Sequence, residues 1–234
     1  MMSKELILLV SANTESSPYP VYPLALPRLA AALKSRGHTV SQYDMLSGSL
    51  PELEQKIRTK KPGLIGLSLR NIDNIDSCTR KSYIGGYAEL VAKIKVCSKA
   101  PVVLGGSGFS IFFTELMAAL GADYGITGRG EETLCRLADL VSEGAPPAKG
   151  LCSGCGPDKK APFSAPAEHD EELMQYYWMN AGMIGVQAKS GCPLNCVYCT
   201  YPLIEGKTVR FAEAGFVADE IELLRKDFGV DYIF

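Results

Sequence analysis

Three cysteines lie close together in the second half of the chain: Cys192, Cys196 and Cys199, with three residues between the first two and two residues between the last two. Cysteine thiolates are the usual protein ligands of iron–sulfur clusters, and a 4Fe-4S cluster is normally held by four of them. Three thiolates at this spacing can bind three irons and leave the fourth iron open. The spacing therefore predicts a 4Fe-4S cluster whose last ligand comes from a small molecule.

A zinc site is the main alternative for such a triplet. Zinc sites usually pair two C-x2-C knuckles or complete the ligand set with histidine, but neither His38 nor His169 lies near the triplet in sequence. Cys152 and Cys155 form a second short pair that could join as a redox or zinc knuckle, although a lone C-x2-C in a Gly- and Pro-rich stretch carries little information. The remaining cysteines are expected to be ordinary buried thiols on or near helices: Cys78, Cys97 and Cys135.

Composition excludes several classes of protein. The 24 basic and 26 acidic residues nearly cancel, so no surface for nucleic acid is indicated. The first apolar run has five residues, whereas a transmembrane helix needs about 20. Eight cysteines without an export signal are expected to be reduced thiols and metal ligands. We therefore expect a cytoplasmic protein that has no transmembrane segment and binds no nucleic acid.

Alternating strand and helix patterns fill the chain up to about residue 142. Continuous apolar runs, as expected for strands buried on both faces of a parallel sheet, predict strands at residues 6–10, 39–43, 64–68, 101–104 and 124–127. Helical spacing predicts helices at residues 24–36, 50–59, 83–99, 110–120 and 131–142. These units predict an α/β fold, a doubly wound, flavodoxin-like domain over residues 1–145 with a five-stranded parallel sheet.

The rest of the chain divides into a linker and a second unit. Residues 146–170 are rich in Pro and Gly and show no helical or strand period, which predicts a linker. The second unit, residues 171–234, begins with a short helix, and a strand at residues 183–188 then leads into the cysteine triplet. An amphipathic helix at residues 212–228 follows, and a last strand begins at residue 230.

Small and polar residues gather in the loops that follow the predicted strands. Ser68 follows the third strand, Gly105 and Gly106 follow the fourth, and Gly128 and Glu131 frame the turn after the fifth. In doubly wound sheets, ligands bind beyond the carboxyl ends of the strands, where the strand order reverses. Glycines there let the backbone approach a ligand closely. A generic nucleotide site is one explanation, but no G-x-G-x-x-G follows the first strand and no P-loop lysine is present.

The cysteine triplet, with Tyr198 directly before its last cysteine, resembles the signature of the radical S-adenosylmethionine (radical SAM) enzymes. The resemblance implies that AdoMet chelates the open iron, that one electron from the cluster cleaves AdoMet to a 5'-deoxyadenosyl radical, and that the backbone near Tyr198 contacts the adenine. It also implies a β/α barrel, which takes ~200–250 residues when complete. The second unit has about 60 residues and stops inside an apolar strand. We therefore expect a fragment of a longer enzyme that is inactive alone.

The loops at the strand ends resemble those of the cobalamin-binding domain that precedes the radical SAM domain in many enzymes. The resemblance covers about residues 4–142 and includes a Tyr-Pro-Leu loop at residues 22–24, a serine after strand three, Gly-Gly after strand four and Gly-x-Gly-Glu after strand five. It implies that cobalamin is contacted by the residues at these positions: Ser68, Leu69, Arg70, Gly105, Gly106, Gly128 and Glu131.

The loop after the first strand departs from one branch of this family. Cobalamin domains of that branch carry Asp-x-His-x-x-Gly there, and the His is the lower ligand of cobalt. The corresponding loop here has no histidine, and His38 precedes strand two, so we expect it on the surface at the opposite edge of the sheet. The resemblance therefore implies base-off cobalamin without a His ligand. Leu69 or Arg70 would face the lower side of the corrin and Ser68 would meet its tail. Alternatively, Arg70 could brace its own loop through Asp73.

The two resemblances together imply a cobalamin-dependent radical SAM enzyme of the kind associated with lipid or natural-product biosynthesis. Cobalamin would carry a methyl group, and the cluster with AdoMet would generate a radical on the unactivated substrate carbon that receives it. The protein would orient the cofactors and exclude water. The implied partners are a small-molecule or lipid-like substrate and a reductant such as flavodoxin or ferredoxin.

Three other functions share parts of this pattern. A radical SAM enzyme that uses cobalamin for a rearrangement or ring closure carries the same motifs. A methylthiotransferase would need a second cluster held by three cysteines of the N-terminal domain, and Cys78 and Cys97, with no cysteine in the first loop, argue against it. A cobalamin carrier or sensor would account for residues 1–142 but leaves the triplet unused. That binding function is the one expected to survive in the fragment alone.

Overall fold

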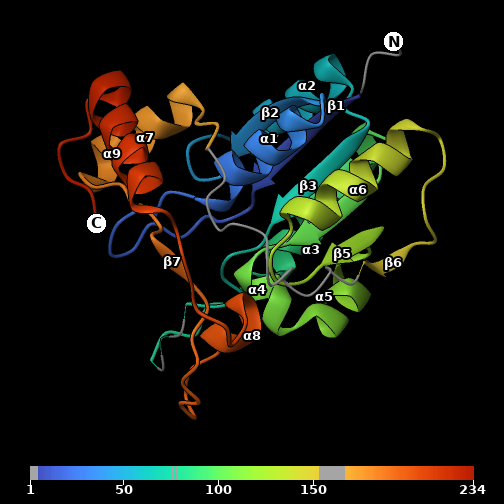
Figure 1. The fold of residues 1–234 in the computed structure, drawn as a ribbon. Coiled ribbons are helices and arrows are strands. Elements are labelled where there is room, and N and C mark those ends of the chain that lie inside the picture. Colours follow the sequence, from blue (N-terminus) through green and yellow to red (C-terminus); the bar gives the residue numbers. More distant parts are fainter. Residues whose placement is uncertain (1–4, 75, 77, 153–166) are drawn as a thin grey trace.

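A six-stranded parallel β-sheet forms the centre of the computed structural model, which describes residues 5–74, 76, 78–152 and 167–234 (Figure 1). The strands stand in the order β2-β1-β3-β4-β5-β6. Their bounds are Leu6–Ser11 (β1), Thr39–Asp44 (β2), Leu64–Ser68 (β3), Val102–Gly105 (β4), Tyr124–Ile126 (β5) and Gly150–Cys152 (β6). The order reverses at β1, which lies between β2 and β3. The predicted doubly wound α/β fold is confirmed.

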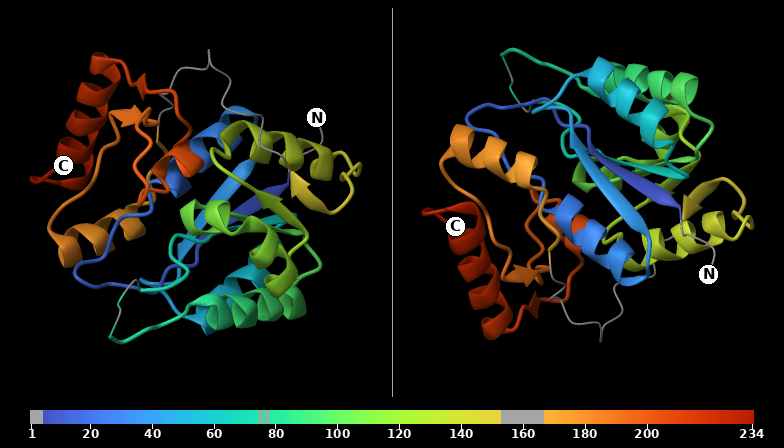
Figure 2. Two further views of the ribbon diagram at one scale, coloured as in Figure 1. Left: turned by 90° about the horizontal axis from the view of Figure 1, so that it is seen from below. Right: turned by 90° about the horizontal axis from the view of Figure 1, so that it is seen from above.

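Helices cover both faces of this sheet (Figure 2). Their bounds are Ala25–Ser35 (α1), Leu50–Lys60 (α2), Ile84–Cys97 (α3), Ser107–Ile111 (α4), Phe113–Leu120 (α5) and Glu131–Ser142 (α6). Helices α1 and α6 pack together on one face, and α2, α3 and α5 pack on the other. Along β1, Ile7 and Leu9 join the first core while Leu8 and Val10 join the second. Burial on both faces explains why the central strands are continuous apolar runs.

Two details differ from the expectation of five strands and one helix after each. Strand β6 lies within the predicted linker and pairs in parallel with β5. It is a three-residue edge strand whose Leu151 is 42% exposed, so it lacks the apolar run that marks the central strands. The helix expected at residues 110–120 is two helices, α4 and α5, which meet at Phe112. Residues 153–166, including Cys155, lie outside the described part of the chain.

The strand register brings four carboxyl ends to one level of the sheet. Ser11 at the end of β1 pairs with Asp44 of β2 on one side and with Ser68 of β3 on the other. Ser68 in turn pairs with Gly105 at the end of β4. The loops that follow these strands therefore leave the sheet beside one another, which is the edge at which doubly wound folds bind ligands.

The second unit contains Glu171–Ala181 (α7), Lys189–Ser190 (β7), Tyr201–Glu205 (α8), Arg210–Phe211 (β8) and Ala214–Phe228 (α9). No regular strand covers the expected residues 183–188. The strand that directly follows them, β7, has two residues and pairs in antiparallel with β8. Ile184 instead forms an isolated parallel bridge with Ile233, supported by a hydrogen bond of 2.9 Å from the Val186 amide to the Phe234 carbonyl. The Ile184 amide also donates to Tyr232 at 3.1 Å and the Phe234 amide to Ile184 at 3.2 Å, so this segment does pair with residues 232–234.

The second unit packs against the first through one shared hydrophobic core. Leu173, Met174 and Tyr177 of α7 are buried in the same cluster as Leu26 and Leu33 of α1. Helix α7 therefore closes the α1 side of the sheet near β2 (Figure 1). In the described part of the chain, every helix is too short or too polar to cross a bilayer.

Candidate functional site

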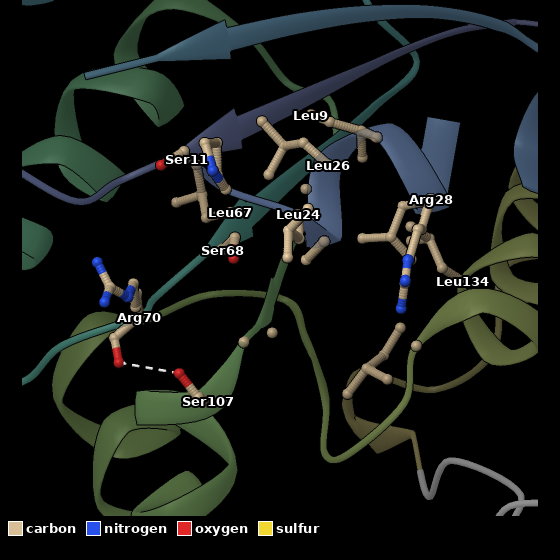
Figure 3. Close-up of a pocket in the computed structure, with 18 of the residues that line it drawn as sticks. Leu9, Ser11, Leu24, Leu26, Arg28, Leu67, Ser68, Arg70, Ser107 and Leu134 are labelled. Atoms are coloured by element: carbon tan, nitrogen blue, oxygen red, sulfur yellow. Dashed lines mark hydrogen bonds between the residues drawn. The ribbon is translucent and has the colours of Figure 1, made fainter. Parts of the chain in front are cut away.

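A cavity of about 360 Å³ opens at the carboxyl ends of the central strands (Figure 3). Residues from β1, β3 and β4 form its floor, α1 and the start of α6 form a wall, and Gln187 and α8 of the second unit complete the lining. Leucines of β1 and α1 give it an apolar side, and serines at the strand ends give it a polar one. The cavity therefore lies at the topological switch point, where the sequence placed the ligand.

Most of the predicted contact residues line this cavity, and one does not. The residues found in the lining are Ser68, Arg70, Gly105, Gly106, Gly128 and Glu131. Leu69 has no exposed surface and belongs to the core on the α3 side of the sheet. Successive side chains alternate along an extended segment, so Leu69 points away from the face that Ser68 and Arg70 share. The Leu69 side chain therefore does not line this cavity, and a contact between Leu69 and a ligand stays a prediction.

Glycines make the floor of the cavity possible. A Cβ at Gly106, whose φ is +99°, would lie 2.7 Å from the carbonyl oxygen of Leu69, so a side chain there is excluded by the close approach of two loops. At Gly105 the nearest atom to such a Cβ is the Ile126 carbonyl oxygen at 3.6 Å, an ordinary contact. Glycine at 106 thus lets the two loops approach each other, and glycine at 105 keeps this part of the floor free of a side chain.

The sequence pattern did not indicate two polar residues that also line the cavity, Arg28 and Gln187. Arg28 lies on α1 and is 8% exposed. Its Nη1 donates to Oε1 of Gln187 at 2.5 Å, and its Nη2 donates to the Gln187 carbonyl oxygen at 3.4 Å. Burial lowers the pKa of Arg28, and the nearby Glu220 carboxylate opposes that change. The sequence contains one indication of a special role for Arg28, because it is a charged residue among the apolar positions of a core-facing helix.

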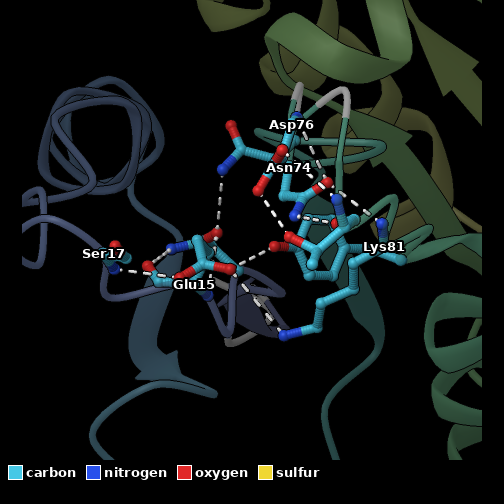
Figure 4. Close-up of polar contacts among 9 residues, drawn as sticks. Glu15, Ser17, Asn74, Asp76 and Lys81 are labelled. Atoms are coloured by element: carbon cyan, nitrogen blue, oxygen red, sulfur yellow. Dashed lines mark hydrogen bonds and ion pairs between the residues drawn. The ribbon is translucent and has the colours of Figure 1, made fainter.

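Two loops meet at the rim of the cavity through a polar cluster (Figure 4). The Tyr83 hydroxyl donates a short hydrogen bond to Glu15, and Lys81 lies 3.7 Å from the same carboxylate. The hydrogen bond from Tyr83 is the main cause that lowers the pKa of Glu15. Asn71 donates to Oδ1 of Asn13 at 3.4 Å. These contacts tie the loop after β1 to the loop after β3, so the rim is preformed.

Buried polar groups join the cavity to the second unit. Tyr22, which lines the cavity, lies with its hydroxyl 3.0 Å from Nδ1 of His169, and His169 packs against Phe228 of α9. The Tyr177 hydroxyl donates to Asp44 at 3.0 Å across the same seam. Burial raises the pKa of Asp44 and lowers the pKa of His169 to about 4. A neutral imidazole can accept a hydrogen bond from the Tyr22 hydroxyl, which agrees with the lowered pKa of His169.

The depressed pKa of His169 predicts a loss of stability in mild acid. The unfolded chain binds the proton near pH 6.5 and the folded chain only near pH 4, so stability falls as the pH drops between these values. Between pH 7.5 and pH 4.5, the free energy of unfolding should fall by about 2 kcal/mol more in the wild type than in His169→Gln. Urea denaturation at a series of pH values measures this difference, and a constant difference would contradict it.

His38 is not the surface residue that the sequence suggested. Its side chain is buried, and its Nε2 lies 3.0 Å from Oδ1 of Asp139 on α6. Arg36 also reaches Asp139, at 3.0 Å. The turn before β2 is covered by α6, a long-range contact that the local sequence does not reveal. The expected position at the opposite edge of the sheet from the cavity is correct, because His38 directly precedes β2.

The cysteine triplet lies on a loop, residues 191–200, that we call the Cys loop. Gly191 has φ +81° and a Cβ there would lie 2.1 Å from the Thr208 carbonyl oxygen, so the loop entrance requires glycine. The Cys192 amide donates to Gly206 at 3.0 Å, and the Cys199 amide donates to Cys196 at 3.2 Å. Cys192 and Cys196 are half-buried and Cys199 is exposed.

The arrangement of the Cys loop is open. Val197 and Tyr198 are almost fully exposed, and no three His, Cys, Asp or Glu side chains of the described residues are placed to hold a metal ion. The donor types and their spacing fit an iron–sulfur cluster, so binding by these cysteines stays a prediction from the sequence. Among the other cysteines, Cys135 is buried and Cys97 is half-buried, but Cys78 is exposed, contrary to expectation.

Known methyltransferases are similar to this chain over nearly its whole length. The chain is 26% identical to a tryptophan 2-C-methyltransferase from Streptomyces laurentii, over 96% of this chain and 48% of that protein. It therefore spans about half the length of the curated relatives it matches. A structure of the radical S-adenosylmethionine methyltransferase TsrM from Kitasatospora setae, with tryptophan and a SAM analogue bound, matches with a TM-score of 0.82 and 26% identity, covering 97% of this chain and 46% of that one.

A second structure of TsrM, with cobalamin and a [4Fe-4S] cluster bound, matches with a TM-score of 0.78 over 98% of this chain and 47% of that one, again at 26% identity. The cobalamin-dependent radical enzyme OxsB matches with a TM-score of 0.70 at 15% identity, over 97% of this chain and 32% of that one, which supports the fold alone. The model of the B12 binding domain matches residues 10–138. The chain is thus homologous to cobalamin-dependent radical SAM proteins, and over more than half of its length it belongs to the B12 binding domain family.

Proposed function

We propose that this chain is part of a cobalamin-dependent radical SAM enzyme that transfers a methyl group to an unactivated carbon of a small molecule. One observation carries the proposal: the residues on both sides of the Cys loop line the cavity of the B12 binding domain. Gln187 precedes the loop, and Ile204 and Glu205 follow it. A cofactor in the cavity and a cluster on the loop would therefore face a common space, as methyl transfer between them requires.

The cavity residues have distinct roles in this proposal. Gly105 and Gly106 would let the corrin approach the strand ends, because no side chain stands between ligand and backbone. Ser68 would contact the tail, since it lies on the floor between β1 and β4. Gly128 and Glu131 would close the far side at the start of α6. When bound, cobalamin supplies a methyl carrier, and the protein supplies orientation and exclusion of water.

The side-chain chemistry of the lining favours cobalamin that is base-off and has no His ligand. No histidine of the described residues lines the cavity, since His38 lies beyond the amino end of β2 and His169 is held by Tyr22. Arg70 lines the cavity and is exposed, with its carbonyl oxygen fixed by the Ser107 hydroxyl at 3.1 Å. We propose that this guanidinium would hold the lower side of a bound corrin, and because it has no acceptor atom it would not itself ligate cobalt. Pairing of Arg70 with Asp73 as a loop brace is the alternative.

The Cys loop would carry the second cofactor pair. We propose that Cys192, Cys196 and Cys199 hold three irons of a 4Fe-4S cluster and that AdoMet occupies the fourth. Tyr198 is exposed, and its backbone would then contact the adenine. Support comes from the ligand types and spacing and from the related TsrM, whose structure contains both cobalamin and a [4Fe-4S] cluster.

The substrate and partners follow from the same relatives. TsrM was solved with a tryptophan substrate, so we propose a small molecule as the methyl acceptor and leave a lipid-like acceptor as the alternative. A low-potential reductant such as flavodoxin or ferredoxin would supply the electron to the cluster. The near-neutral charge balance gives no indication of nucleic-acid binding. The eight cysteines of the chain favour a reducing, cytoplasmic location.

An anaerobic absorbance spectrum tests the proposal most directly. The full-length protein would be reconstituted with iron and sulfide, mixed with hydroxocobalamin and desalted. Broad thiolate-to-iron absorption together with sharp corrin bands is the expected result. Iron absorption without corrin bands would contradict the cobalamin role. Methyl transfer from AdoMet to product, followed by mass spectrometry, would then separate methylation from a rearrangement, which leaves the substrate mass without the added methyl.

A further inference from the structure

The Cys loop is anchored to the cavity wall at both of its ends. Gln187 lies five positions before Cys192 and lines the cavity. Ile204 and Glu205 of α8 follow the loop and line the cavity as well. Helix α8 packs on α4, and a Cβ at Gly128 would lie 3.4 Å from the Ile204 carbonyl oxygen. Any shift of the loop ends must therefore change the wall of the cavity.

Arg28 of α1 hydrogen-bonds Gln187, which lies just before the Cys loop. One guanidinium nitrogen donates to the side-chain oxygen of Gln187 at 2.5 Å and the other donates toward its backbone oxygen at 3.4 Å. These two hydrogen bonds hold both the side chain and the main chain of Gln187, which a planar guanidinium does better than an ammonium group. Figure 3 shows Arg28 at the opposite side of the cavity from Arg70.

Gln187 also lies near Tyr201, the residue that directly follows the Cys loop. The Tyr201 phenol at the start of α8 lies within interaction range of the Gln187 side chain and of the Gly191 backbone. Gln187 thus lies between Arg28 on one side and Tyr201 on the other. Residues before and after the cysteines are held by the same amide side chain.

The charge of Arg28 is retained at a cost. Burial of a guanidinium disfavours its charged form, and a well-packed apolar residue is often as stable at such a position. Three carboxylates from separate elements interact with it favourably, those of Glu131, Glu205 and Glu220, while Arg129 opposes it. Two of the carboxylates, at positions 131 and 205, line the cavity from the two units. Arg28 is therefore placed where the two units meet at the ligand.

We propose that Arg28 is a positioning residue that holds the Cys loop against the cavity, so that filling of the cavity and the conformation of the Cys loop are coupled. The part of this inference that concerns cofactors rests on the proposed function. The mechanical part, that Arg28 orders the loop through Gln187, does not. A ligand that presses on the wall at Arg28 would shift Gln187 and with it both ends of the loop.

Hydrogen exchange of the cofactor-free full-length protein tests the mechanical part. The amides of Cys192 and Ala212 are hydrogen-bonded at 3.0 and 2.9 Å and so report on order around the Cys loop. Arg28→Met should speed exchange in peptides of residues 188–212 by at least about fivefold and leave β1 and β3 unchanged. Methionine is unbranched and favours helix about as well as arginine does, so α1 should persist.

Arg36→Met is the matched control, because Arg36 lies just beyond the same helix and its ion pairs run to Glu132 and Asp139 on α6. It should leave the exchange of residues 188–212 at the wild-type rate. If Arg28→Met fails to fold, Arg28→Lys serves instead, since lysine keeps the charge but cannot hold both oxygens of Gln187. Unchanged exchange around the Cys loop in the folded Arg28 variant would overturn the inference.

Binding of hydroxocobalamin tests the coupling. In the wild type, reconstitution of the cluster should change the affinity for hydroxocobalamin by about fivefold or more, within the usual range of coupled sites. In Arg28→Met this ratio should fall to within about twofold of one, while Arg36→Met keeps it. A wild-type ratio of one, or an unchanged ratio in Arg28→Met, would overturn the coupling. Failure of the wild type to bind hydroxocobalamin would instead refute the proposed function and leave the exchange result standing.

Discussion

Cys199→Ala is expected to abolish assembly of the iron–sulfur cluster while leaving the B12 binding domain intact. Loss of even an outer contact of a metal ligand commonly costs 10- to 100-fold in affinity, and loss of a ligand itself should lower bound iron and sulfide by at least about tenfold. Cys199 lies on the exposed Cys loop and outside both hydrophobic cores. Iron and sulfide analysis after reconstitution measures the first effect, and hydroxocobalamin binding measures the second.

Cys78→Ala provides the control for Cys199→Ala. Cys78 is also exposed, but it lies in the loop after β3 and far in sequence from the triplet. The Cys78→Ala variant should assemble a normal cluster, which would show that loss of an exposed thiol does not by itself prevent cluster assembly. Full iron and sulfide in Cys199→Ala would remove the central claim about the triplet. The same result would leave the cavity and its ligand untouched.

Gly105→Leu is expected to block the cavity without disturbing the sheet. A Cβ at this position meets no atom closer than 3.6 Å, and glycine is itself unfavourable in a strand. The added side chain would project into a space of about 360 Å³, and overfilling of a packed site costs about 1–3 kcal/mol. Hydroxocobalamin affinity should therefore fall by roughly 5- to 150-fold, as measured by absorbance titration of the full-length protein.

Gly86→Leu is the matched substitution outside the site. Gly86 lies on the exposed side of α3, and a Cβ there has nothing within 4 Å. Leucine should favour the helix by up to about 1 kcal/mol relative to glycine and leave hydroxocobalamin affinity unchanged. If Gly105→Leu bound hydroxocobalamin as tightly as Gly86→Leu does, the cavity would not be the corrin site. Far-ultraviolet circular dichroism of both variants checks that the fold persists.

The central strands could be predicted because each carries its own burial signal. In a parallel sheet covered on both faces, both sides of a strand are buried, so β1 is apolar from Leu6 to Val10 and only its last residue, Ser11, is polar. Strand β6 at the edge carries no such signal, and its existence depends on pairing with β5. The segment before the Cys loop is similar, because its bridge from Ile184 to Ile233 joins residues distant in sequence.

The candidate site divides in the same way. Ser68, Gly105 and Gly128 could be placed at the cavity from their positions after strands, because parallel strands end at one edge. The direction of the Leu69 side chain could not be predicted without the backbone conformation of its loop. Because successive side chains alternate, Leu69 points into the core. Arg28 and Gln187 are separated by 159 positions in sequence, so their contact had no local pattern.

By itself, the sequence determined which chemistry this chain can support: three thiolates at one spacing, and small residues at the ends of β3, β4 and β5. Local features of this kind persist in any packing that preserves the strands. The tertiary structure alone decided that the Cys loop is anchored at the wall of the cavity and that Arg28 connects the two. Such contacts depend on how two units share a core across Tyr177 and Leu33, and the free energy of that packing is a property of surfaces far apart in the chain.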